Sequence, residues 1–402
     1  METLHLTEGA PPVTWELPDE IAQALADSGI VEIAPAGHGQ WRVAAGRKIG
    51  VARVREVQLA ITPKVRIDRL VFMMGYAQAP DFWRDHTVAV DVEQDLPEAL
   101  AEAFGRLATR ALEQGLLHGY REVEETLPVM RGRIRVGDQI SRRYGRNLPL
   151  EVRYDEFSAD IPENRLLLAA TVQLLRMGVS ATARRRLQRL RLQLADVTLP
   201  PRGTGMPAWR PSRLNVRYQP ALHLAELVLA GQSFEHRTGD LQVSGFLFDM
   251  WRIYEDFVGV AMREALGAFG GESSLQHRLH LDEARTVAMR PDFVWTRGGV
   301  PALVADMKYK AEKPTGFPNA DLYQLLAYCT VMGLREGHLI YAQGAEDPAI
   351  HDIAGADVQI HAHALDLDQP PKALVEQVEG LAMRLVRGVV GLAKHHETPT
   401  TT

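Results

Sequence analysis

The sequence predicts a multidomain α+β protein with a β-rich N-terminal module, a mainly helical middle region and a C-terminal α/β core. Three patterns predict this order. Polar and apolar residues alternate over short segments before residue 95, and apolar residues recur at helical spacing between residues 96 and 240. From residue 241 to 395, helical and strand patterns alternate. With 402 residues and 46% apolar content, the chain can bury two or three cores.

The first 95 residues are expected to form a small β-rich module that docks a partner. Val57, Leu59 and Ile61 alternate with more polar neighbours, as in a half-buried strand. Strands are predicted over residues 40–44, 49–54 and 57–61, and an apolar run at residues 70–76 closes the module. The chain has no stretch of about eighteen apolar residues and no apolar leader, so we expect a cytoplasmic protein without membrane contact.

The middle region, residues 96–240, is expected to be mainly helical and strongly basic. Between Arg131 and Arg217 there are 18 Arg, no Lys and 7 acidic residues, a net charge of +11, which leaves −17 for the rest of the chain. Arginine suits phosphate because it forms two parallel hydrogen bonds. We expect DNA contacts from one helix face, although a solvated face or a surface for the acidic remainder explains the same pattern. The candidate contacts are Arg184, Arg185 and Arg189.

The C-terminal region, residues 241–395, is expected to contain a helix, a hairpin and a second helix, then further strands and a last helix. The first helix is predicted over residues 245–266, with Phe248, Trp251 and Tyr254 on its apolar face. The second includes residues 321–329. Later strands are predicted at 337–342 and 357–363 and the last helix at 371–393, and residues 396–402 are expected to be a flexible tail.

Residues 290–310 carry the strongest functional signal. Two apolar runs, at 292–296 and 300–305, are separated by Arg-Gly-Gly, where glycines suit a tight turn. Antiparallel pairing would set Asp292 beside Asp306, and strand alternation would place Asp306 and Lys308 on one side. Charges at the end of an apolar strand are costly unless they serve a site. The alternative is a surface hairpin with solvated charges.

Two aspartates and a lysine in this arrangement point to metal-dependent phosphodiester chemistry. Carboxylate oxygens suit Mg²⁺, or Mn²⁺, which leaves positions for water and phosphate. Asp292 and Asp306 are the expected metal ligands, and Lys308 would orient the attacking water. Glu255 would reach the metal through water, unless it is only a solvated helix charge.

Two groups on the second helix complete the expected site. Gln324 and Tyr328 are four residues apart and share one helix face. Gln324 would orient the site and Tyr328 would contact DNA, and the alternative is that both pack at the edge of a core. Lys310, on the strand of Lys308, is a further candidate DNA contact.

The order of these segments resembles the PD-(D/E)XK nuclease superfamily in its Q-x-x-x-Y variant. More narrowly, the chain resembles the McrC family, the nuclease subunit of McrBC modification-dependent (type IV) restriction systems. The resemblance spans roughly residues 40 to 330. It includes the hairpin and four further segments: Ile61-Thr-Pro-Lys-Val65, residues 68–76 (Asp-Arg-Leu-Val-Phe-Met-Met-Gly-Tyr), Met130-Arg-Gly-Arg-Ile134 and residues 154–167.

The resemblance implies a C-terminal PD-(D/E)XK core that cleaves double-stranded, methylated DNA. It also implies a hexameric AAA+ GTPase partner, McrB-like, whose hydrolysis the N-terminal module stimulates. This chain lacks the G-x-x-x-x-G-K-[ST] loop, so it is not expected to bind nucleotide itself. A dimer through the nuclease domain would suit a double-strand break. Two alternatives stay open: a repair or recombination nuclease without modification dependence, and a non-catalytic adaptor of an AAA+ motor.

Overall fold

The computed structural model describes residues 3–85, 95–144, 146–201, 205–231, 236–238, 241–311, 319–343 and 349–395. The chain forms two compact units, one from residues 1–96 together with 234–402, the other from residues 97–233. The chain passes between the units after residues 96 and 233. The first and last predicted segments, however, share one unit. No helix among the described residues is long and apolar enough to span a bilayer.

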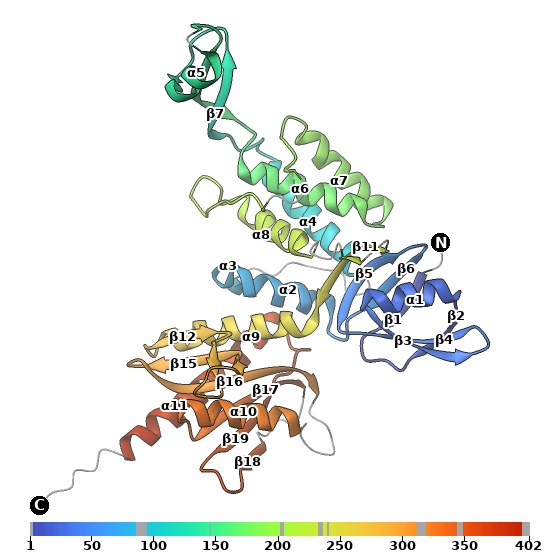
Figure 1. Ribbon diagram of the computed structural model, residues 1–402, viewed down its shortest axis with the longest axis vertical. Coiled ribbons are helices and arrows are strands. Elements are labelled where there is room, and N and C mark those ends of the chain that lie inside the picture. Colours follow the sequence, from blue (N-terminus) through green and yellow to red (C-terminus); the bar gives the residue numbers. More distant parts are fainter. Residues whose placement is uncertain are drawn as a thin grey trace, which may run out of the picture. The chain divides into compact units, whose positions relative to one another are not determined.

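The N-terminal part of the first unit is built on two small sheets (Figure 1). In the larger sheet β1 pairs in parallel with β6, and β6, β5, β11 and β10 pair antiparallel in that order. The second sheet has the order β2-β4-β3. The strands are β1 (Thr3–Thr7), β2 (Val13–Glu16), β3 (Val31–Gly37), β4 (Gln40–Ala45), β5 (Lys48–Val54), β6 (Val57–Thr62), β10 (His236–Thr238) and β11 (Leu241–Asp249). The strands predicted at residues 40–44, 49–54 and 57–61 are present as β4, β5 and β6.

Helices accompany these sheets. The apolar run at residues 70–76 lies within a helix that buries most of its length. The helices are α1 (Asp19–Ser28), α2 (Ile67–Gln78) and α3 (Pro80–Asp85). The ring of Tyr76 packs against Phe72 and against Phe257 of the C-terminal part, with ring centroids 5.7 and 5.6 Å away. Aromatic contacts therefore connect the N-terminal and C-terminal parts of the first unit.

The helix predicted over residues 245–266 begins later than expected. Residues up to Asp249 form β11, and α9 spans Met250–Gly267. Phe246 and Leu247 pair with Val51 and Gly50 of β5 and are buried. Their apolar side chains would fit a helical pattern equally well. The segment is a strand because its backbone pairs with β5.

The C-terminal part is a six-stranded mixed sheet of order β12-β15-β16-β17-β19-β18. The three strands β16, β17 and β19 are parallel, and the remaining pairs are antiparallel. The strands are β12 (Glu272–Leu275), β15 (Phe293–Arg297), β16 (Val300–Ala311), β17 (Glu336–Gln343), β18 (Ala349–Asp352) and β19 (Gln359–Ala364), with a separate pair β13 (Leu279–His280) and β14 (Ala288–Met289). The strands predicted at residues 337–342 and 357–363 are thus confirmed.

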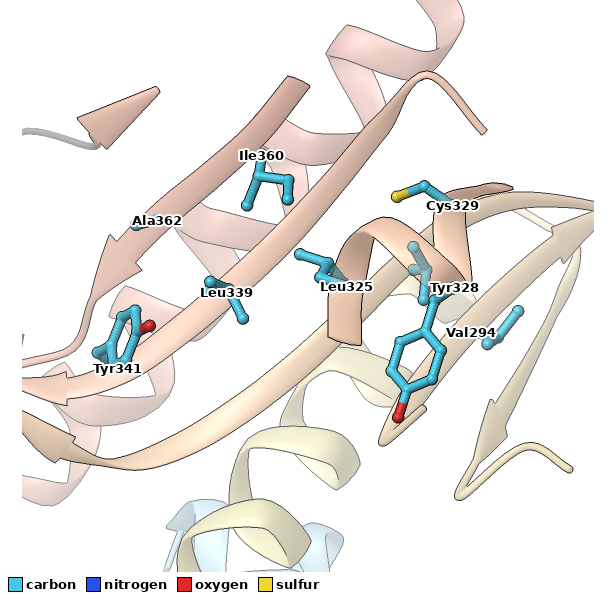
Figure 2. Packing of buried hydrophobic residues seen from close by; sticks show 9 residues of the cluster. Val294, Leu325, Tyr328, Cys329, Leu339, Tyr341, Ile360 and Ala362 are labelled. Carbon is cyan, nitrogen blue, oxygen red and sulfur yellow. The ribbon is translucent and has the colours of Figure 1, made fainter. Parts of the chain in front are cut away.

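Two helices follow within this part, α10 (Asn319–Met332) and α11 (Pro371–His395). Figure 2 shows side chains of α10 beside those of the neighbouring strands, and Leu325 and Cys329 are fully buried there with Leu339 of β17. This apolar contact fixes α10 over the sheet, because buried apolar area is the main stabilising term in such packing. The predicted tail, residues 396–402, lies outside the described residues.

The second unit is less purely helical than predicted. Helices α4 (Leu96–Leu112), α6 (Pro162–Arg176), α7 (Ala181–Gln193) and α8 (Gln219–Ala230) are joined to an arm made of β7 (Gly119–Leu127), β8 (Arg133–Ile134), α5 (Val136–Arg143) and β9 (Leu150–Ser158) (Figure 1). The arm strands are held by cross-strand ion pairs, among them Arg153 with Glu124 at 2.6 Å. Leu150, Val152 and Tyr154 of β9 alternate with charged residues, so a strand pattern was present there although no strand was predicted.

A buried carboxylate anchors the base of this arm. Asp160 accepts hydrogen bonds from Arg165 (2.7 Å), from Arg121 (2.8 Å) and from the backbone and hydroxyl of Thr198 (both 2.9 Å). The Arg165 guanidinium holds the pKa of Asp160 well below its ordinary value, and the Thr198 bonds add to this effect. The network ties β7, α6 and the segment after α7 together.

Candidate active site

The predicted hairpin forms, and its turn is tighter than expected. Arg297 pairs directly with Val300, so Gly298 and Gly299 alone make the turn, with φ of 60° and 81°. These positive φ values suit a two-residue turn that favours glycine. Phe293 pairs with Ala305, which places Asp292 opposite Asp306 at the end of the ladder.

Asp292 is held in place by two hydrogen bonds. The Met307 N–H donates to Asp292 Oδ2 at 2.9 Å, and Gln276 Nε2 donates to Oδ1 at 2.8 Å. The Asp306 side chain is buried, with 1% of the residue exposed. Gln276 was not anticipated, because it lies in the segment after β12 and no local pattern in the sequence links it to Asp292.

Lys308 connects the carboxylates to α10. Its ammonium contacts Asp306 Oδ2 and donates to Gln324 Oε1 at 3.2 Å. Gln324 Nε2 in turn donates to the Tyr328 hydroxyl at 2.7 Å. Tyr328, predicted to contact DNA, is only 2% exposed and lies in the apolar core under α10 (Figure 2), so it supports Gln324 instead. The predicted pairing of Gln324 and Tyr328 on one helix face is therefore confirmed.

The site concentrates negative charge in a poorly solvated place. Burial, and next the charge of Asp306, raise the pKa of Asp292 above its ordinary range. Burial, and next Asp292, raise the pKa of Glu255 on α9 to about 8. Burial alone would lower the pKa of Lys308, but Asp306 outweighs it and the net pKa is raised. Burial and neighbouring carboxylates thus make Asp292 and Glu255 less acidic, and the lysine stays charged.

These residues fit a bound Mg²⁺ or Mn²⁺. Within the described part of the chain, no set of three or more His, Cys, Asp or Glu side chains could hold a metal ion. Mg²⁺ needs fewer protein ligands, because it commonly binds one or two carboxylates and takes its remaining oxygens from water and phosphate. Asp292 and Asp306, opposite each other at the end of the paired strands, supply two such carboxylates.

A cleft of about 1550 Å³ opens beside these residues, within the first unit. Glu255 and Lys308 line it, together with Arg47 and Lys64 of the N-terminal part. Trp251 lines it too and is 41% exposed, so its expected place on the buried face of the helix is wrong. Only the packing of residues 1–96 onto the C-terminal sheet creates this cleft, so sequence spacing gave no indication of it.

The remaining candidate DNA contacts lie elsewhere. Arg184, Arg185 and Arg189 are exposed on α7 of the second unit, while Leu187 and Leu190 of the same helix are buried. Of these three arginines none forms an ion pair with another described residue. The side chain of Lys310 lies outside the described part of the structure. DNA contact by these four residues stays a prediction.

Comparisons with known proteins give the family. The model of a family described as McrBC 5-methylcytosine restriction system component matches residues 43–342. A search of curated proteins finds no significant match. A chain from the refined half-complex of a tetradecameric assembly of Thermococcus gammatolerans McrB AAA+ hexamers with bound McrC is 19% identical. The match covers 96% of this chain and 100% of that one, with a TM-score of 0.61.

A chain from the cryo-EM structure of the Thermococcus gammatolerans McrBC complex is 20% identical, with a TM-score of 0.39. That match covers 66% of this chain and 88% of that one. At such identities, the structural likeness with the TM-score of 0.61 concerns the fold alone. The family model, in contrast, spans most of the sequence. This chain therefore belongs to the family of McrBC 5-methylcytosine restriction system components.

Proposed function

We propose that this chain is the Mg²⁺-dependent endonuclease subunit of a modification-dependent restriction complex of the McrBC type. One observation carries the proposal: Asp292, Asp306 and Lys308 converge at the end of one hairpin, and Gln324 holds the lysine. The PD-(D/E)XK resemblance of these segments assigns them nuclease roles. Family membership supports the restriction setting.

The site residues divide the work of phosphodiester hydrolysis. Asp292 and Asp306 would hold Mg²⁺, or Mn²⁺, and the bound ion would acidify a water molecule and neutralise phosphate charge. Lys308, fixed between Asp306 and Gln324, orients the attacking water and balances charge on the phosphate. Glu255, whose pKa is about 8, is suited to exchange a proton with that water near neutral pH.

We infer that a separate motor drives cleavage. The chain has no phosphate-binding loop of the G-x-x-x-x-G-K-[ST] type. The similar solved assembly is described as McrB AAA+ hexamers with bound McrC, and we propose the same class of GTPase partner here. We further propose that this chain stimulates the partner's hydrolysis and that the nuclease part pairs with a second copy to cut both strands.

The arm of the second unit offers a surface for that partner, in addition to the N-terminal module. Large apolar side chains are exposed along it, including Val129 (66%), Met130 (63%), Ile140 (66%) and Tyr144 (91%). Clustered exposed apolar side chains are typical of protein interfaces. The arm therefore supports the view that this chain works in a complex.

The test is cleavage of methylated and unmethylated plasmid with Mg²⁺, with and without GTP or ATP and a McrB-like motor protein. The proposal expects cleavage that requires methylation, nucleotide, partner and Lys308, so Lys308→Ala should be inactive. Lys372→Ala is the matched control, because this lysine is 88% exposed on α11 and lies outside the cleft. Full cleavage by Lys308→Ala would contradict the assignment.

The two alternatives give different outcomes in the same assay. Cleavage that needs only metal and Lys308 would identify an autonomous nuclease of the repair type. Stimulation of the motor's GTP hydrolysis without cleavage under any condition would identify an adaptor. The buried carboxylate pair argues against the adaptor, because an adaptor gains nothing from two adjacent carboxyls that burial makes costly to ionise.

A further inference from the structure

Trp251 occupies an unusual position for a tryptophan. Trp83 and Trp295 are each only 1% exposed, whereas Trp251 is 41% exposed and lines the cleft. It lies four residues before Glu255 on α9, so the two side chains share one helix face. The indole thus lines the same open space as Glu255 and Lys308.

Arg47 lies next to this tryptophan. The Met250 N–H, at the start of α9, donates to the Arg47 carbonyl at 3.4 Å. The Arg47 side chain is exposed, lines the cleft and forms no ion pair with any other described residue. The backbone of Arg47 is therefore held at the start of α9, and its guanidinium has no ion-pair partner among the described residues.

Lys64 brings a second cation to the cleft near Lys308. The Lys64 N–H donates to Glu8 Oε2 at 3.1 Å, and the hydroxyl of Tyr309, the residue after Lys308, donates to the same oxygen at 3.1 Å. Lys64 is exposed and lines the cleft. Glu8 thus joins the loop that carries Lys64 to the strand that carries the site.

The size and lining of the cleft suit a polymer. Pockets for single small molecules measure roughly 300–1,000 Å³, and this cleft is larger, at about 1550 Å³. Among the acidic residues that line it, Glu8 accepts from the Lys64 N–H and the Tyr309 hydroxyl, and Asp366 accepts from the Asp368 N–H and from Gln369. Arg47 and Lys64 line the cleft from the N-terminal part and Trp251 from the start of α9, while Lys308 and Arg384 line it from the C-terminal part.

We propose that Trp251 is a stacking platform for an unpaired DNA base and that Arg47 and Lys64 bind the phosphates of the same strand. The inference rests on the proposed nuclease function and deepens it: the strand enters the site locally unpaired. An aromatic ring stacks on any base, and cations beside it follow the backbone, which is how single strands are bound without regard to sequence. Trp251 is then a positioning residue for substrate binding.

The test measures binding of the full chain to a short labelled single-stranded oligonucleotide by fluorescence anisotropy, with Ca²⁺ replacing Mg²⁺. Trp251→Ala should weaken binding roughly 5- to 150-fold, the loss expected for one base–aromatic stack. Trp251→Phe should retain most of the affinity. Arg47→Ala and Lys64→Gln should each lower the slope of log affinity against log salt by roughly 0.7.

Two controls separate stacking from a general effect. Tyr323→Ala removes an aromatic side chain that is 68% exposed on α10 but does not line the cleft, and it should bind normally. On an oligonucleotide with abasic positions, wild type and Trp251→Ala should bind equally. Any of three outcomes would overturn the inference: Trp251→Ala binds with wild-type affinity, Tyr323→Ala shows a defect of the same size, or the wild type does not bind.

The readout also separates this inference from the nuclease proposal. Binding is measured without cleavage. If binding depends on Trp251 but the chain never cuts DNA, the nuclease proposal is refuted and the stacking inference stands. If the chain cuts DNA but its binding does not depend on Trp251, the stacking inference is refuted and the nuclease proposal stands. A Trp251 effect of equal size on fully paired duplex would refute stacking on an unpaired base.

Discussion

Binding of Mg²⁺ to the Asp292–Asp306 pair should release a proton, so the apparent affinity should rise with pH. Burial and Asp306 raise the pKa of Asp292 from its ordinary value of 3.8, and the carboxyl must be ionised to bind a cation. While Asp292 is mostly protonated, each added pH unit should tighten the apparent dissociation constant about tenfold, because one proton leaves for each ion bound. The dependence should level off above the raised pKa.

Stability should follow the same linkage with a definite sign. Without metal, the folded protein keeps protons on Asp292 and Glu255 at pH values where the unfolded chain has lost them. Its stability must therefore fall as pH rises from the ordinary carboxyl pKa toward the raised values, which for Glu255 is about 8. Mg²⁺ should reverse much of this loss, since it binds the folded, ionised site.

Calorimetric titration of Mg²⁺ in two buffers with different ionisation enthalpies counts the protons released. We expect about one proton per ion at mildly acidic pH and fewer as pH rises. Asp292→Asn should abolish this proton release. Glu255→Gln measures how much of the proton release comes from Glu255. Lys372→Ala should match wild type. Mg²⁺ binding by wild type with no proton release at mildly acidic pH would refute the reasoning, because Asp292 would then be ionised despite its burial.

Three further outcomes follow from single contacts. Gln324→Ala should lower kcat about 10- to 100-fold with little change in KM, since it only holds Lys308; steady-state cleavage kinetics measure this. Asp160→Asn should lower the free energy of unfolding, measured by urea denaturation, by about 3–5 kcal/mol. Acid should have a similar effect. Because the pKa of Asp160 is lowered in the folded protein, its contribution to stability is present above pH 3.8 and is lost as the pH falls toward the folded-state pKa. Gly50→Ala should lower Tm, because its φ is +114° and a Cβ would come within 2.1 Å of a β11 carbonyl oxygen; Gly267→Ala, with open space, should not.

Sequence periodicity placed the candidate site because its geometry is mostly local. Alternation along β16 sets Asp306 and Lys308 on one side, and the two glycines of the turn fix the hairpin that brings Asp292 to them. Helical spacing likewise placed Gln324 one turn from Tyr328. The chemistry of these residues stays a prediction, whereas their convergence is observed.

Other features depended on contacts between distant segments. Residues 245–249 carry apolar side chains that fit a helix or a strand, and pairing with β5 makes them a strand. The arm strands were not predicted although β9 alternates apolar and charged residues; its pairing with β7 and β8 is a contact between separate segments. The orientation of Trp251 and the hydrogen bond from Gln276 depend on which surfaces meet after folding.

The sequence by itself thus determined the hairpin, the two helices beside it and the residue types of the site, because turns and side-chain periodicity are properties of neighbouring residues. Only the tertiary structure decided that the N-terminal module shares a unit with the C-terminal sheet and encloses a cleft with it. The physical reason is that Glu8 and Tyr309 meet across 301 positions in sequence, and no local pattern records such a contact.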